Sequence, residues 1–249
     1  MPSNTLTGAP EGKTQPVATR PSSGQTAARV REIIGDTPCM TLKQGERIIK
    51  FILENETCDI LELGTAHGVS SCYMAAALEL AGTGSIVTCD LESGRLRKPN
   101  VEELLQRCGV SHRVTIHRDP TSYNWQLMKF LRDEPSARFD LCYLDGAHTW
   151  AVDGLAFFLV DRLLKPGGWI IFDDLNWTFA TSPSLRDADF VQKMPKDERE
   201  SPQVRILYEL LVKTSPSYHM FHEAEGWAFA QKRMARNAAV PSNSELNSD

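Results

Sequence analysis

Short apolar runs alternate along the chain with longer segments in which apolar side chains recur every three to four positions. Short runs bounded by glycine or acidic residues predict strands, and the longer segments predict amphipathic helices. The predicted strands are a short apolar run that ends at Glu62, followed by residues 85–89, 113–117, 139–144 and 169–172. The predicted helices cover residues 27–34, a segment starting after Thr41, 69–80, 99–108 and 150–164. A repeated order of strand and helix predicts an open α/β sheet with parallel strands.

The pattern changes after the fifth strand. Residues 175–202 are mostly polar, contain Pro183 and Pro195 and show no clear period, so we interpret them as a mobile lid or substrate segment. A helix is predicted at 204–212. Two further runs, 217–223 and 226–231, predict a C-terminal hairpin.

The two ends of the chain differ from its middle. Residues 1–26 hold four prolines and almost no large apolar side chains, so they cannot bury enough surface to fold alone. We predict a disordered arm at 1–26, one folded domain at 27–236 and a loose tail at 237–249. We find no internal repeat.

Composition narrows the class of protein. A net charge of −5 gives no electrostatic reason to expect nucleic acid or an anionic membrane as a partner. No apolar run approaches the ~20 residues that cross a bilayer, and the first residues lack an apolar signal core. The six cysteines form no C-x-x-C pair, and several lie in apolar strands, so reduced thiols and a cytoplasmic location are expected.

The loop after the first strand carries the first chemical signal. It reads E-x-G-x-x-x-G-x-S from Glu62 to Ser70, whereas a dinucleotide-binding loop would read G-x-G-x-x-G. Gly64 permits a tight turn, and Gly68 is expected to let a ligand approach the start of the next helix. Glu62, at the strand end, can accept hydrogen bonds from a ligand. The alternative is a tight connection in some other Rossmann-like enzyme.

This loop resembles motif I of class I S-adenosylmethionine (SAM) methyltransferases, in the variant of the catechol-type and related metal-dependent O-methyltransferases. The resemblance covers about residues 39–177 and, more loosely, the chain up to Lys232. It implies a Rossmann-like, seven-stranded, mostly parallel sheet with helices on both faces and a C-terminal antiparallel hairpin. It also implies that the helix starting after Thr41 covers SAM. The residues it implies for SAM binding are Glu62, Gly64, Thr65, Ala66, Gly68, Ser70 and Asp90.

Asp90 follows the second strand, about 20 residues after the glycine loop. An acidic residue in this place suits recognition of ribose hydroxyls, and in the family it accepts hydrogen bonds from the SAM ribose. The alternative is that Asp90 caps the loop that follows.

Acidic residues also end the fourth and fifth strands. Because neighbouring strands lie ~4.8 Å apart, Asp145, Asp173 and Asp174 are expected to converge on one cation, and a set of oxygen ligands favours Mg²⁺. His148 follows Asp145 by three residues, where the catechol-type enzymes hold a lysine base, so we interpret His148, with Asp145, as catalytic. Alternatively, Asp145 and His148 only start the next helix, and the paired aspartates bond to backbone.

The sequence is therefore interpreted as a SAM-dependent O-methyltransferase that methylates a hydroxyl of a small natural product, sugar or catechol-like ring, with Mg²⁺ orienting the acceptor. Two rivals stay open: a metal-independent methyltransferase, for which nitrogen is also an open acceptor, and a SAM-binding protein without catalysis. The expected partner is a small-molecule acceptor, with no nucleic acid and no membrane. Assembly into a homo-oligomer is left open.

Overall fold

The computed structural model describes residues 20–234. The predicted tail, 237–249, lies outside the described residues, as does the predicted arm up to residue 19. The rest of that arm differs from the prediction, because helix α1 begins at Ser23 rather than at Ala27. Ser22 caps this helix, and its side chain accepts a hydrogen bond from the backbone of Gln25.

A seven-stranded sheet forms the centre of the molecule, with the strand order β3-β2-β1-β4-β5-β7-β6. Strands β1 to β5 are parallel, whereas β7 lies antiparallel between β5 and β6. This confirms the predicted mostly parallel sheet with an antiparallel hairpin. The strands are β1 (Asp59–Leu63), β2 (Ser85–Leu91), β3 (Val114–Asp119), β4 (Phe139–Leu144), β5 (Leu164–Phe172), β6 (Tyr218–Ala224) and β7 (Trp227–Lys232).

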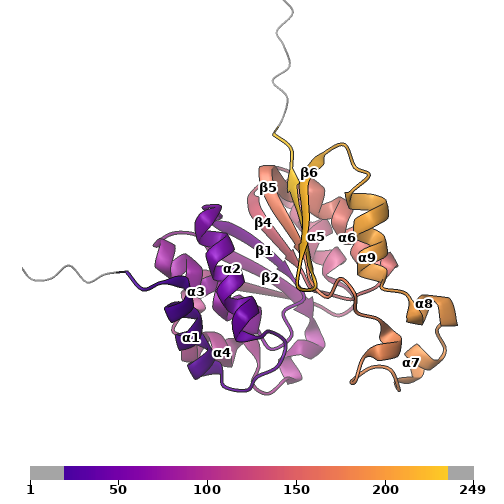
Figure 1. Ribbon diagram of the computed structural model, residues 1–249, viewed down its shortest axis with the longest axis horizontal. Helices are drawn as coiled ribbons and strands as arrows, with labels where there is room; N and C mark the ends of the chain where they lie inside the picture. The colour runs from indigo at the N-terminus through magenta and orange to yellow at the C-terminus, as the bar shows by residue number, and fades with distance from the viewer. Residues whose placement is uncertain (1–19, 235–249) are drawn as a thin grey trace, which may run out of the picture.

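Helices cover both faces of this sheet (Figure 1). One face carries α1 (Ser23–Ile34), α2 (Leu42–Glu54), α3 (Val69–Ala81) and α4 (Val101–Cys108). The other carries α5 (Tyr123–Asp133), α6 (Trp150–Leu163) and α9 (Gln203–Leu207), which continues as a single π-helical turn, Tyr208–Val212. Two apolar clusters fill the two interfaces between helices and sheet, so each face of the sheet has its own core.

Local signals explain where several elements begin and end. Thr41 caps α2 as predicted, because its hydroxyl accepts from the backbone of Gln44 while the Gln44 side chain reaches back to it. Lys165–Gly168, whose proline and two glycines are typical of a turn, belongs to β5 instead. The strand pair β4–β5 shifts register there, between Phe139 and Leu141, and such an irregularity accommodates proline and glycine within a strand.

The segment 175–202 lies between β5 and α9. It contains three short helical turns, Phe179–Thr181, α7 (Asp189–Gln192) and α8 (Lys196–Glu200). In Figure 1, α7 and α8 extend away from the sheet. Within residues 20–234, no helix is long and apolar enough to cross a membrane.

Candidate active site

A cavity of about 110 Å³ opens at the carboxyl ends of β1, β2 and β4. In open α/β sheets this is the edge at which ligands bind. The cavity is lined by Gly64 and Asp90 from the predicted site, together with residues from the loops after β3 and β4. Those further lining residues include Thr121, Ser122, Tyr123, Gly146 and Ala147.

Asp90 is held in place by the glycine loop. One of its carboxylate oxygens accepts a hydrogen bond from the backbone of Ala66 at 2.8 Å, and the other accepts from the backbone of Leu91 at 2.7 Å. Ala66 adopts φ +48°, which turns its N–H towards the carboxylate. The loop therefore fixes the orientation of Asp90 at the wall of the cavity.

Three of the residues expected to bind SAM face the interior instead. Glu62 is fully buried, and its two oxygens accept hydrogen bonds from the hydroxyls of Ser70 and Ser71. The Thr65 hydroxyl is also buried and pairs with that of Thr88. Burial raises the pKa of Glu62 to about 6, although its serine partners act in the opposite direction. The polar atoms of Glu62, Thr65 and Ser70 are thus bonded within the protein, where they support the loop from below.

Both glycines of the loop are required by packing. Gly64 adopts φ +93°, and a Cβ atom there would overlap the backbone carbonyl of Asp145. Gly68 adopts φ +87°, and a Cβ atom there would overlap Val101 of α4. The space that a side chain at position 68 would fill is therefore occupied by α4. Gly64 lets the loop pack directly against the backbone of Asp145, which belongs to the cluster of side chains described next.

Asp145, His148 and Asp174 come together beside this loop. Their ligand atoms all lie within 4.8 Å of one another. His148 Nε2 lies 3.3 Å from Asp145 Oδ1 and 3.4 Å from Asp174 Oδ2. Asp145 and His148 follow β4, and Asp174 follows β5, so neighbouring strands deliver the group as predicted.

Asp173 does not belong to this group. It is 5% exposed, one oxygen accepts from the backbone of Asp174, and the other accepts from the hydroxyl of Tyr143. Burial raises the pKa of Asp173 to about 6, against the hydrogen bond from Tyr143. Of the three aspartates predicted to converge, the structure thus brings together Asp145 and Asp174, with His148 between them, while Asp173 turns inward.

His148 is the centre of the group. Burial disfavours its charged form, but the hydrogen bond to Asp145 and the charges of Asp145 and Asp174 outweigh burial and raise the pKa of His148 to about 9. Its ring packs on that of Trp177, with centroids 4.8 Å apart, and Trp177 in turn packs on Phe179. His148 and Asp174 both have positive φ, at +56° and +53°, a strained conformation that often marks functional residues.

Sequence reasoning missed the support beneath the His148 loop. Asp153 is fully buried in α6, and it accepts a hydrogen bond from the hydroxyl of Tyr123, which also accepts one from the backbone of Ala147 at 3.1 Å. Burial raises the pKa of Asp153. The available signal was an acidic residue one turn into a helix whose other charged residues, Asp161 and Arg162, lie at its far end.

A larger cavity, of about 650 Å³, lies elsewhere. It is bounded by α1, α3 and α4, and its lining includes Arg29, Val30, Glu79 and Cys108. It contains none of the predicted site residues, so size alone does not locate the chemistry of this fold.

The fold is shared with solved methyltransferases. The O-methyltransferase TomG from Streptomyces achromogenes, involved in tomaymycin synthesis and solved with SAM, is 22% identical with a TM-score of 0.57, and the alignment covers 86% of this chain and 91% of that one. An O-methyltransferase from Bacillus cereus in complex with S-adenosylhomocysteine (SAH) is 18% identical with a TM-score of 0.58, covering 88% and 94%. The SAH-bound methyltransferase PaMTH1 from Podospora anserina is 19% identical with a TM-score of 0.59, covering 87% and 89%.

Sequence comparison gives a more local result. No curated protein matches the chain significantly. A family model described as a methyltransferase domain matches residues 61–175, which include the glycine loop, Asp90, Asp145, His148 and Asp174. Residues 61–175 thus match a methyltransferase domain, and the chain as a whole shares the fold of O-methyltransferases solved with SAM or SAH.

Proposed function

We propose that the chain is an O-methyltransferase that moves the methyl group of SAM to a hydroxyl of a small molecule, with a divalent cation orienting that hydroxyl. The observation that carries the proposal is the group formed by Asp145, His148 and Asp174 at the edge of the cavity that Asp90 lines. O-methyltransferases of this fold bound to SAM or SAH support it.

SAM is assigned to the cavity at the ends of β1, β2 and β4. Asp90 accepts hydrogen bonds from the ribose hydroxyls, for which its orientation by Ala66 and Leu91 prepares it. Gly64 supplies backbone at the floor of the same cavity. Glu62, Thr65 and Ser70 act through the loop that they hold, without touching the cofactor.

The residues present fit a divalent cation. Two carboxylates and one imidazole within 4.8 Å of one another are common ligands for Mn²⁺, and the two carboxylates alone suit Mg²⁺, the ion expected from the sequence. A cation bound there lowers the pKa of an acceptor hydroxyl and holds it in place. Asp173 and Tyr143 orient the neighbouring Asp174 from behind, as outer partners of metal ligands do.

A metal-independent reaction is the second candidate, and one observation favours it. His148 Nε2 is shared between Asp145 and Asp174, and this ion-pair network is complete without a metal. In that case the neutral ring of His148 removes the proton of the acceptor through Nδ1, while Nε2–H donates to Asp145, which orients the ring. A cation would need the lone pair of Nε2, whereas the metal-independent reaction keeps a proton on Nε2, so the two candidates are exclusive at this atom.

One experiment separates these candidates. Purified protein is incubated with methyl-tritiated SAM and a panel of catechols, phenols and sugars, with EDTA or with Mg²⁺ or Mn²⁺. We expect labelled product that disappears in EDTA and returns with the metal. Full turnover in EDTA would establish the metal-independent reaction. SAH binding measured by calorimetry, with no labelled product from the panel or from cell extract, would favour a non-catalytic SAM-binding protein.

A further inference from the structure

The first turn of α9 contacts both loops that carry the candidate metal ligands. Gln203 is 5% exposed, and its side-chain oxygen accepts a hydrogen bond from the backbone of Trp150 at 2.7 Å. Arg205, two residues later, donates from Nε to the side-chain oxygen of Asn176 at 2.8 Å. Trp150 follows His148 by two residues, and Asn176 follows Asp174 by two.

The Gln203 contact holds the start of α6. The backbone N–H of Trp150 belongs to the first turn of α6, where it has no partner within the helix. Gln203 provides that partner, and its amide nitrogen donates in turn to the backbone carbonyl of Glu198 in α8 at 3.0 Å. The buried amide therefore fixes where α6, and with it the His148 loop, begins.

The Arg205 contact holds the turn that carries Asp174. This turn is closed by a hydrogen bond from the backbone of Trp177 to the carbonyl of Asp174 at 2.9 Å, and Asn176 lies inside it. Trp177 also packs on His148. A shift of Asn176 therefore moves Asp174 and the ring that packs on His148 together.

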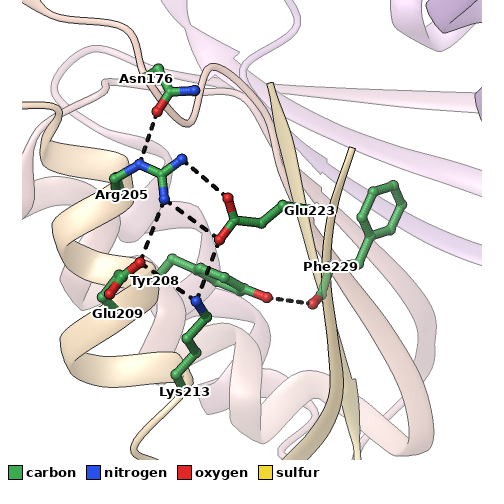
Figure 2. A network of polar contacts seen from close by, with 7 residues as sticks. All are labelled: Asn176, Arg205, Tyr208, Glu209, Lys213, Glu223 and Phe229. Atoms are coloured by element: carbon green, nitrogen blue, oxygen red, sulfur yellow. Dashed lines mark hydrogen bonds and ion pairs between the residues drawn. The ribbon is translucent and has the colours of Figure 1, made fainter. Parts of the chain in front are cut away.

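The helix that makes both contacts is itself fixed to the sheet. Val204 and Leu207 are buried in the core, and the hydroxyl of Tyr208 donates to the backbone carbonyl of Phe229 in β7 at 2.8 Å. Figure 2 shows Arg205 between Asn176 and Glu223 of β6, which accepts from it at 3.1 Å. Gln203 and Arg205 are therefore presented by a helix that is firmly packed on the sheet.

We propose that Gln203 and Arg205 are positioning residues: together they set the distance between the loop of Asp145 and His148 and the loop of Asp174. Neither side chain is assigned a contact with substrate or cofactor. The inference rests on the proposed function, in which the same three side chains bind one cation. Partners that orient metal ligands typically change metal affinity or activity by ~10–100-fold when they are removed.

Lys213 provides a matched control for Arg205. Arg205 contacts the carboxylates of Glu209 and Glu223. Lys213 contacts the same two, at 3.5 Å and 3.3 Å, but it does not contact Asn176 (Figure 2). Arg205→Met removes the contact with the Asp174 turn, whereas Lys213→Met perturbs the same charge network without it. For Gln203, the matched pair is Gln203→Met, which loses both hydrogen bonds, and Gln203→Glu, which keeps the acceptor for Trp150.

The test measures Mn²⁺ affinity by electron paramagnetic resonance and SAH affinity by calorimetry on the full chain. We expect Arg205→Met and Gln203→Met each to weaken Mn²⁺ binding by about tenfold or more, with SAH affinity within twofold of the wild type. Lys213→Met should stay within twofold for both ligands, and Gln203→Glu should recover most of the lost Mn²⁺ affinity. Wild-type Mn²⁺ affinity in both methionine variants would overturn the inference.

Hydrogen exchange gives a readout that needs no metal. Gln203→Met should speed amide exchange in peptides covering 146–151, and Arg205→Met should do so in peptides covering 174–178, while Lys213→Met leaves both unchanged. If the wild type bound no Mn²⁺, the metal assignment would fail, and this pattern would then decide the positioning role. Unchanged exchange in both methionine variants would overturn that role.

Discussion

At the scale of single residues, Glu62 is a carboxylate enclosed by the protein. The fold raises its pKa from 4.5 to about 6, so between these values the folded state binds more protons than the unfolded chain. The contribution of Glu62 to stability is therefore complete below pH 4.5 and is lost as the pH rises through 6. The shift corresponds to about 2 kcal/mol.

Glu62→Gln removes this titration, and the serine hydroxyls can rotate to meet the amide. The free energy of unfolding of the variant, relative to the wild type, should rise by about 2 kcal/mol between pH 4.5 and pH 7.5. Urea unfolding at the two pH values measures it. Glu79→Gln is the control with the opposite sign, because Arg113 lowers the pKa of Glu79. Parallel pH profiles for Glu62→Gln and the wild type would contradict the assignment.

Gly64 gives a second prediction at this scale. Gly109 shares its positive φ, at +72°, but has open space where a Cβ atom would be placed. Gly109→Ala should lose about 1 kcal/mol from backbone strain alone, whereas Gly64→Ala should lose at least twice that, because its Cβ atom displaces Asp145. Thermal unfolding of both variants measures the difference, and equal losses would remove the packing argument.

The sequence located most of the candidate site because acidic residues at strand ends have a restricted set of positions. Asp90, Asp145 and Asp174 were chosen in this way, and His148 was chosen from its place three residues after Asp145. The sequence could not show which of Asp173 and Asp174 faces His148. Adjacent side chains point in different directions, and the left-handed backbone at Asp174 cannot be read from a sequence pattern. The inward orientation of Glu62 could not be predicted either. Its hydrogen-bond partners, Ser70 and Ser71, lie in the next helix, and a sequence pattern does not show that they meet it.

At the scale of elements, α1 shows how a boundary changes a prediction. The polar composition of the residues before Ala27 predicted a disordered arm, but the capping box of Ser22 and Gln25 extends the helix by a full turn. Ala27, Val30 and Ile34 of this helix are buried against the core. When the apolar face of a helix packs against the core, the helix is stable enough to include polar residues in its first turn.

Removing residues 1–26 therefore removes the first turn of α1 and its cap. The melting temperature should fall by several degrees, since a cap alone contributes about 1 kcal/mol, or ~2–4 °C for a chain of this size. Ser22→Ala should show part of this loss, and Ser22→Thr, which keeps a hydroxyl, should show little. Differential scanning calorimetry measures all three, and an unchanged melting temperature after truncation would show that the first turn contributes nothing.

Other elements followed from strong local patterns. The strands and most helices were predicted within a few residues, because their apolar periodicity agrees with their burial. Helix α5 was not predicted, since only Tyr123, Gln126 and Leu127 of its residues are buried. The Lys165–Gly168 stretch was misassigned because proline and glycine usually end a strand, whereas here Pro166 is exposed at a register shift.

At the scale of the whole molecule, SAH binding should stabilise the folded chain. A ligand that binds only the folded state at 100 times its dissociation constant adds about 2.7 kcal/mol, which raises the melting temperature by several degrees. Asp90→Ala should lose most of this increase, and Asp133→Ala, a change at a surface carboxylate paired with Arg132, should keep it. Thermal shift measurements with and without SAH compare them. A full increase in Asp90→Ala would return Asp90 to a capping role.

The hairpin of β6 and β7 reaches the site from the far end of the described chain. The backbone of Leu175, next to Asp174, donates to the carbonyl of Gly226 at 2.9 Å, and Arg205 reaches Glu223. Gly226 and Glu223 are translated long after Asp145 and Asp174, whose loops these contacts help to hold. On the ribosome, Asp145, His148 and Asp174 exist before the contacts that arrange them, so a nascent chain acquires the complete site only once this hairpin has emerged.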